Sequence, residues 1–310
     1  MPITFISRPP RARRTRRRAP DLRLAPPRAV RALSLRLMTL NVAHARRQGR
    51  HQALLSESTL RQNLAAIAAV LRREAPDVVA LQEADGPSAW SGGFDHVSTL
   101  AELSGLPHAF RGEHNPFSLG SLDLSSGTAL LARTALREPR SHAFGETWRD
   151  TKGFVAATVE SAALGQRAVD VVSIHLDFLA ERVRRRQVEQ LVERYRGRER
   201  PLVVLGDFNC EWSERRRCLA LLRKELGLRA AEATGHATFP SWRPLVRLDW
   251  ILVSEELDFA AYETLPDRLS DHLAVVADLH LRAGSHRRAT GEADDDQPAR
   301  VLAAPAPRQR

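Results

Sequence analysis

Apolar and polar residues follow one another along residues 35–281 in a pattern that predicts eight buried strands and four helices. Short, mostly apolar runs predict strands at 35–44, 77–83, 127–133, 154–160, 169–177, 202–206, 248–254 and 273–281. Longer stretches with apolar residues three and four apart predict helices at 59–75, 99–106, 180–197 and 213–226. So many strands alternating with helices predict an α/β fold in which two sheets pack together beneath outer helices.

The two ends of the chain lack this pattern. Residues 1–35 are rich in Pro and Arg, and residues 283–310 are small, polar and charged, as is typical of disordered segments. We therefore expect one folded domain over residues 36–282, with a disordered arm before it and a disordered tail after it.

The net charge of +10 is concentrated in the arm. Residues 1–36 carry eleven Arg and one acidic residue, whereas residues 37–282 carry 31 basic and 32 acidic side chains. The overall charge therefore says little about what the central domain binds. The arm either contacts polyanions, such as nucleic acid or an anionic lipid surface, or is simply a solvated extension.

Hydropathy and cysteine content predict a cytoplasmic protein, which we also expect to be a monomer. No apolar run approaches the roughly 18–20 residues that span a bilayer, so we expect no transmembrane segment. The first residues lack the apolar core of a secretory signal. Cys210 and Cys218 are too few for a disulfide framework and suit a reducing compartment.

Polar residues recur where the predicted strands end or begin. Taken singly, each has an ordinary explanation as a turn residue, a helix cap or a buried histidine. Together they predict a site at one end of the fold, because strand ends of α/β proteins are where sites form. The residues concerned are Asn41, Glu83, His175, Asp177, Asp207, Asn209, Asp249, Asp271 and His272.

The residue types in this set favour metal-assisted chemistry. Carboxylates and amides dominate, and hard oxygen ligands of this kind suit Mg²⁺ or Mn²⁺ better than a structural Zn²⁺. A histidine beside carboxylates supplies acid–base function or stabilises developing charge. Hydrolysis of a phosphate ester by a metal-activated water requires these groups.

Ordered motifs along the chain resemble a known superfamily. They are "TLNVAH" (39–44), "LQE" (81–83), "GTALLAR" (127–133), "KGF" (152–154), "SIHLDF" (173–178), "LGDFNC" (205–210), "RLDWILVS" (247–254) and "SDHLAV" (270–275). Over about residues 36–282 the chain resembles the endonuclease/exonuclease/phosphatase (DNase I-like) superfamily. The resemblance implies a four-layer α/β/β/α sandwich of two packed mixed sheets flanked by helices.

The resemblance also implies roles for the residues of this set other than Asp177, and for Lys152. Glu83 resembles the main metal carboxylate, with Asn41 beside it and Asp271 in support, and Mg²⁺ is the implied ion with Mn²⁺ as its substitute. His272 resembles the histidine that contacts the scissile phosphate, oriented by Asp249. The remaining implied roles belong to Asp207 (activating water), Asn209 (binding phosphate), His175 (a second phosphate-facing histidine and general acid) and Lys152 (a cation near the phosphate).

The substrate is less well defined than the reaction. The chain has "HLDF" where the abasic-site endonucleases of the superfamily carry a tyrosine motif, and its near-neutral core lacks the basic excess of a duplex-DNA groove. We predict a Mg²⁺-dependent phosphoesterase that cleaves a phosphodiester. The alternatives are a nuclease acting on DNA or RNA and, in another class, a non-catalytic protein that binds polyanions through its arm.

Overall fold

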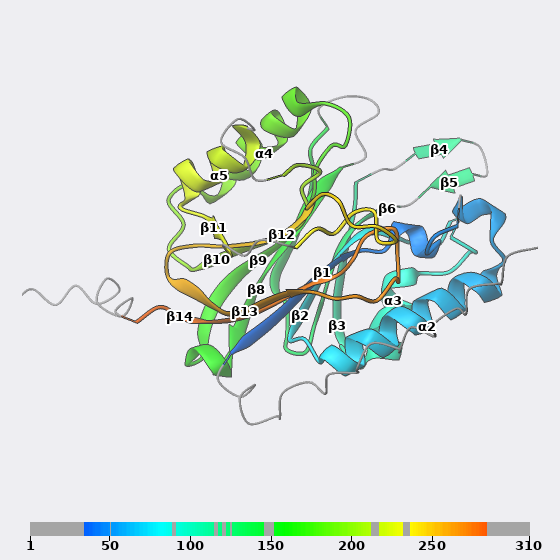
Figure 1. Ribbon diagram of the computed structural model, residues 1–310, viewed down its shortest axis with the longest axis horizontal. Helices are drawn as coiled ribbons and strands as arrows, with labels where there is room; N and C mark the ends of the chain where they lie inside the picture. Colours follow the sequence, from blue (N-terminus) through cyan, green and yellow to red (C-terminus); the bar gives the residue numbers. More distant parts are fainter. Residues whose placement is uncertain are drawn as a thin grey trace, which may run out of the picture.

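The structure is a computed structural model, and it describes residues 34–49, 51–88, 91–114, 117–119, 122–124, 126–145, 152–211, 217–231 and 236–283. The arm and tail expected from the sequence therefore lie almost entirely outside the described residues. Two six-stranded mixed sheets make up the centre of the molecule (Figure 1).

The first sheet has the strand order β13-β14-β1-β2-β6-β3, and the second has β11-β12-β10-β9-β8-β7. Within them, β1 is parallel to β2 and β9 is parallel to β10, while the other pairs are antiparallel. The strands of the first sheet are β1 (Leu35–Asn41), β2 (Val78–Asp85), β3 (His108–Glu113), β6 (Ser126–Ala132), β13 (Leu257–Thr264) and β14 (Val275–Leu281). Those of the second are β7 (Arg137–Ala143), β8 (Gly153–Ser161), β9 (Arg167–His175), β10 (Leu202–Asp207), β11 (Arg229–Ala230) and β12 (Asp249–Val253). A small hairpin, β4 (Phe117–Leu119) and β5 (Leu122–Leu124), stands apart.

The four predicted helices cover the outer faces of the sheets (Figure 1). They are α2 (Glu57–Glu74), α3 (His96–Ser104), α4 (Glu181–Tyr195) and α5 (Arg217–Leu226), and short 3-10 turns lie at η1 (Ala43–Ala45), η2 (Gln52–Leu54) and η3 (Ala162–Leu164). Alternate residues of the central strands point to opposite faces. In β10, Val203 packs between the sheets and Val204 packs toward α4 and α5. Both faces are thus buried, and the predicted four-layer α/β/β/α sandwich is confirmed.

All eight predicted strands are present, and all of them are interior strands. The longer strands that were missed, β3, β7 and β13, lie at sheet edges, as does the two-residue β11. Strand β7 is exposed along almost its whole length, so its sequence carries no apolar pattern. Two predicted strands also end early: β1 ends at Asn41 and β9 at His175.

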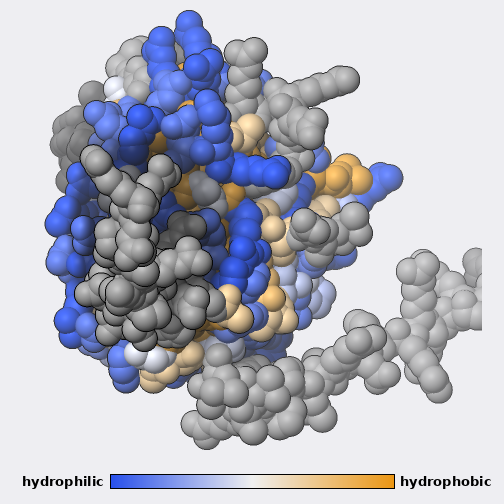
Figure 2. Space-filling model, turned by 90° about the vertical axis from the view of Figure 1, so that its left-hand side faces the viewer, coloured by the Kyte–Doolittle hydropathy of each residue, from blue (hydrophilic) through white to orange (hydrophobic). Residues whose placement is uncertain are grey.

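The surface is mostly polar where Figure 2 displays it, with apolar residues visible in smaller patches between hydrophilic ones. Among the described residues, no helix combines the length and apolar character needed to cross a membrane.

Gly206 allows β10 to approach β9 closely just before Asp207. Its φ is +149°, and a Cβ at this position would lie 2.0 Å from the carbonyl oxygen of Ile174. We expect Gly206→Ala to lower the free energy of unfolding by about 2–5 kcal/mol, because strain and overpacking add. Urea unfolding followed by circular dichroism measures this loss.

The matched control is Gly105→Ala. Gly105 also has a positive φ, +74°, but a Cβ there would meet nothing within 4 Å. This control carries only the backbone cost of a left-handed residue, about 1–2 kcal/mol. Equal losses for the two variants would show that the close contact with Ile174 is unimportant.

Candidate active site

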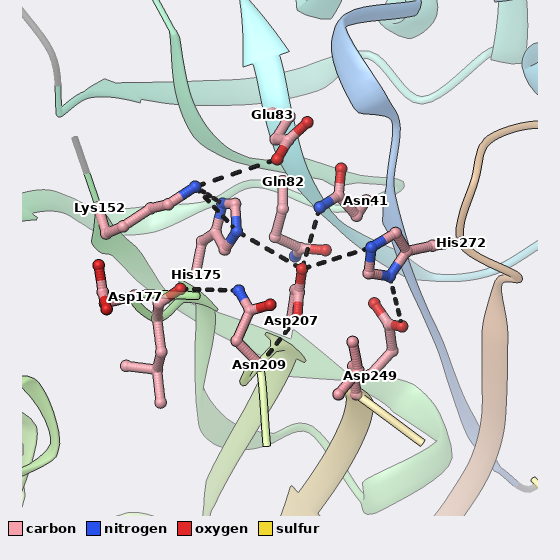
Figure 3. A network of polar contacts seen from close by, with 12 residues as sticks. Asn41, Gln82, Glu83, Lys152, His175, Asp177, Asp207, Asn209, Asp249 and His272 are labelled. Atoms are coloured by element: carbon pink, nitrogen blue, oxygen red, sulfur yellow. Dashed lines mark hydrogen bonds and ion pairs between the residues drawn. The ribbon is translucent and has the colours of Figure 1, made fainter. Parts of the chain in front are cut away.

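One end of the paired sheets collects polar side chains from seven different places in the sequence (Figure 3). Asn41, Glu83, His175 and Asp207 lie at or near the ends of β1, β2, β9 and β10, which run in parallel pairs. Asp249 begins β12, which is antiparallel to β10 and pairs with it at Asp207. Lys152 precedes β8, and His272 precedes β14. The topology therefore brings these predicted site residues together.

Asp207 is at the centre of this group and is fully buried. Its Oδ2 accepts a hydrogen bond from Asn41 Nδ2 at 3.0 Å, and its Oδ1 accepts one from the Asn209 backbone N–H at 2.9 Å. The same Oδ2 lies 3.5 Å from His175 Nε2 and 3.7 Å from His272 Nε2. Burial raises the pKa of Asp207 to about 6, although the charge on His272 acts in the opposite direction. A carboxyl group with this pKa can accept a proton near neutral pH.

His272 is paired with a second buried carboxylate. Its Nδ1 lies 2.8 Å from Asp249 Oδ2, and its ring packs against Phe239 with centroids 4.9 Å apart. Burial would lower the pKa of His272, but Asp249 and Asp207 outweigh it and raise the pKa to about 10. His272 is therefore an imidazolium at neutral pH, with Nε2–H directed toward Asp207. The orienting role of Asp249 stays a prediction, and the distance of 2.8 Å between the two side chains permits it.

His175 has the opposite character. Lys152 Nζ lies 3.0 Å from His175 Nε2 and 3.2 Å from Nδ1. An ammonium group only donates hydrogen bonds, so it favours an imidazole nitrogen without a proton. Burial, followed by the charge of Lys152, lowers the pKa of His175 well below its ordinary value. The site thus holds one charged and one neutral histidine, on either side of Asp207 (Figure 3).

A bulge in β2 brings Glu83 into the site. The register with β6 shifts between Leu81 and Ala84, and Glu83 has a φ of +51°. Because of this bulge, Gln82 and Glu83 both join the group although they are neighbours in sequence (Figure 3). Strained residues of this kind concentrate at functional sites. Asn209, another site residue with a positive φ (+50°), donates from Nδ2 to the Leu176 carbonyl at 2.8 Å.

A second histidine–carboxylate pair, His44 with Asp85, lies behind Glu83 and was not predicted from the sequence. His44 Nε2 lies 3.3 Å from Glu83 Oε2, and His44 Nδ1 lies 2.8 Å from Oδ1 of the buried Asp85. His44 reaches this place through left-handed backbone at Ala43–Ala45, where the Ala43 N–H donates to Asn41 Oδ1 at 2.9 Å. No residue pattern marks such a turn, so only the position of His44 after "NVA" hinted at it.

Gln82 was also missed, and it connects the two sheets beneath the site. Its Nε2 donates to Ser173 Oγ of the second sheet at 3.2 Å, and its Oε1 accepts from Thr39 Oγ1 at 3.3 Å. This buried network fixes the separation of β2 and β9, whose ends carry Glu83 and His175.

Two polar residues of the predicted set take other partners. Asp271 Oδ2 accepts from Arg46 Nη2 at 2.6 Å, so in this structure its carboxylate is committed to an ion pair. Asp177 Oδ1 accepts from the backbone N–H groups of Leu179 and Ala180, which lie just before α4. Asp177 therefore stabilises the turn that precedes α4.

The donor groups around Glu83 fit a hard divalent cation. Burial alone would raise the pKa of Glu83, but the nearby charges of His44 and Lys152 hold it well below the ordinary value. Glu83 is therefore a carboxylate, and Figure 3 shows the Asn41 amide on the neighbouring strand beside it. A second group, formed by Asp207, Asp249 and His272, has ligand atoms within 4.8 Å of one another. Both groups already have partners within the protein, His44 beside Glu83 and Asp249 beside His272, so the choice of Glu83 as the main metal carboxylate stays a prediction.

Sequence and structure comparisons match most of this chain to known proteins of one family. The family model described as "Endonuclease/Exonuclease/phosphatase family" matches residues 38–272. No curated protein sequence matches significantly. Among solved structures, an endonuclease/exonuclease/phosphatase from Beutenbergia cavernae is 24% identical with a TM-score of 0.61, covering 80% of this chain and 72% of that one.

Two further structures share the fold. The human nocturnin catalytic domain with bound sulfate is 21% identical with a TM-score of 0.60, covering 82% of this chain and 95% of that one. A mannosyl-6-phosphatase from Bacteroides thetaiotaomicron is 18% identical with a TM-score of 0.59, covering 79% and 99%. At these identities the likeness demonstrates a common architecture.

Proposed function

Because this chain belongs to the endonuclease/exonuclease/phosphatase family, whose members act on phosphate esters, we propose that it is a Mg²⁺-dependent phosphodiesterase. The observation that carries the proposal is the buried Asp207 carboxylate, whose Oδ2 lies 3.5 Å from His175 Nε2 and 3.7 Å from His272 Nε2. The reaction is hydrolysis by in-line attack of water on phosphorus.

Asp207 acts as the proton acceptor for the attacking water. Asn41 and the Asn209 N–H hold its two oxygens, so its orientation is fixed before substrate binds. Its pKa of about 6 leaves it mostly ionised at pH 7 to 8, yet basic enough to take a proton. Asn209 belongs to the same turn and would hydrogen-bond the phosphate.

His272 and Lys152 stabilise the charge that develops on the phosphoryl oxygens. His272 directs Nε2–H into the site while Asp249 maintains its charge and orientation. Lys152 contributes a second positive charge 4.0 Å from Glu83 Oε1 and contacts His175. His175 is neutral here, so hydrogen bonding to substrate suits it better than donating a proton as a general acid.

Glu83 and Asn41 are the residues that would hold Mg²⁺, and Mn²⁺ would substitute for it. When bound, the ion neutralises charge on the phosphate and favours ionisation of water. Asp271 would support the ion only after leaving Arg46. His44 and Asp85 hold one oxygen of the Glu83 carboxylate in place.

Removal of divalent metal tests the proposal directly. After dialysis against EDTA, we expect hydrolysis of bis-p-nitrophenyl phosphate to stop, and Mg²⁺ or Mn²⁺ to restore it. Glu83→Gln should require at least about tenfold more Mg²⁺ for half-maximal activity. The control is Glu160→Gln at the far end of β8, which should behave as the wild type. Full activity in EDTA would contradict a metal-dependent reaction.

The pKa values of Asp207 and His272 predict a bell-shaped pH profile. Below pH 6, Asp207 is protonated and cannot accept a proton, so kcat/KM should rise about tenfold per pH unit up to about 6. Above pH 10, His272 loses its charge and kcat/KM should fall. Initial rates between pH 4.5 and 10.5 at constant free Mg²⁺ measure both limbs. A flat profile between pH 5 and 7 would exclude Asp207 as the proton acceptor.

A further inference from the structure

Exposed apolar side chains are concentrated around the candidate active site. Among the described residues, six large hydrophobic side chains are exposed, and four of them form two pairs in loops of the site. Phe178 (63% exposed) and Leu179 (77%) follow β9 and His175. Trp242 (53%) and Leu245 (66%) lie in the loop that leads to Asp249. A fifth, Leu54, lies in the connection after β1, and only Leu103 on α3 is elsewhere.

Ring contacts connect each pair to a site residue. Lys152 Nζ lies 5.8 Å from the centre of the Phe178 ring. The Trp242 ring lies 6.5 Å from Phe239, which itself packs against His272. Lys152 and His272 are on opposite sides of Asp207 in Figure 3. The two pairs therefore border the place of the reacting phosphate on opposite sides.

Exposed arginines accompany these apolar residues. Arg182 lies three residues after Leu179, and Arg243 directly follows Trp242. These two arginines and Arg268 are exposed. Arg268 Nη2 donates to the Trp242 carbonyl at 3.3 Å. Apolar side chains flanked by arginine match a phospholipid surface, where phosphates lie above acyl chains. Nucleic acid fits less well, because residues 37–282 carry no excess of basic side chains.

We propose that Phe178 and Leu179, together with Trp242 and Leu245, dock the catalytic end onto a phospholipid bilayer. The phosphodiester hydrolysed there belongs to an amphiphile in that surface. Water oxygen bonds to phosphorus, the P–O bond to one alcohol breaks, and that alcohol receives a proton. The substrate part of this inference rests on the proposed phosphodiesterase function, whereas the docking part does not.

Flotation with phosphatidylcholine vesicles in 0.5 M salt tests the docking. These vesicles carry no net charge, so binding by the arginine-rich arm is suppressed. We expect the full chain to float, and the double variants Phe178→Ser with Leu179→Ser, and Trp242→Ser with Leu245→Ser, to partition at least about tenfold less. Leu103→Ser is the matched control and should float like the wild type. Circular dichroism spectra and urea midpoints like those of the wild type show that all three variants are folded.

Other results would overturn the docking. One is a wild-type chain that hydrolyses the soluble ester but does not float. Another is flotation only with phosphatidylglycerol at low salt, equally in every variant, because this would assign binding to the arm. A third is loss of single-stranded oligonucleotide binding in the double variants, without vesicle binding, which would identify these residues as base contacts. Flotation as expected with no ester turnover would instead overturn the proposed function and leave the docking intact.

Discussion

Asp207→Asn is expected to lower kcat by about 1,000-fold while the protein stays folded. The substitution keeps the shape of the side chain but removes its ability to take a proton from water. Asparagine has only one acceptor oxygen, whereas Asp207 accepts from both Asn41 Nδ2 and the Asn209 N–H. One of these donors loses its partner, so we also expect a loss of about 1–2 kcal/mol in stability. Single-turnover hydrolysis of bis-p-nitrophenyl phosphate and urea unfolding measure the two effects separately.

The control for this variant lies at the other end of the same strands. Asp170 pairs in register with Leu202, five residues before the pairing of His175 with Asp207, and contacts Thr158 and Arg200. Asp170→Asn also removes a carboxylate from the second sheet, but far from the site, and should keep the wild-type kcat. If Asp207→Asn retained most of its activity, another group would have to accept the proton.

The sequence predicted the interior of the fold well because burial on both faces leaves a strong signal. Strands β1, β2, β9 and β10 each contribute side chains to the layer between the sheets and, on their other face, to the layer under the helices. Apolar residues accordingly occur on both faces of each of these strands. Edge strands do not share this constraint. Strand β7 ("REPRSHA") is exposed at nearly every position, so its hydrogen bonds to β8 define it rather than its side chains.

The same distinction explains what could be predicted of the site. Asp207, Asn209 and His175 directly follow or end apolar strands, so their common location follows from the topology of parallel neighbours. His44 depends on a left-handed turn after β1, and Gln82 depends on the bulge that also places Glu83. Both are local irregularities that depart from the period of a strand. Asp271 shows what a strand-end pattern cannot reveal, because its carboxylate forms an ion pair with Arg46, a residue 225 positions away in the sequence. Its support of a metal ion stays a prediction.

The pair formed by Asp249 and His272 should act as one unit. Asp249 is completely buried, and its Oδ2 lies 2.8 Å from His272 Nδ1. In Asp249→Asn the carboxylate that maintains the charge of His272 is gone, and burial then favours the neutral ring. We expect kcat/KM at pH 8 to fall about 100- to 1,000-fold, and the alkaline limb to move from near pH 10 to below pH 8.

His272→Ala should cause a loss of similar size, since the same charge is removed. If Asp249 works only through His272, the variant that combines Asp249→Asn with His272→Ala should be no slower than His272→Ala alone. Without the imidazole ring, Asp249 has nothing to orient. A fully additive loss in the double variant would mean that Asp249 contacts the substrate or the metal by itself. Its second oxygen, Oδ1, is buried without a hydrogen-bond partner among the described residues, so it is the atom through which such an independent contact would act. The pH profile of Asp249→Asn separates the two cases, since only the loss of orientation and charge at His272 moves the alkaline limb.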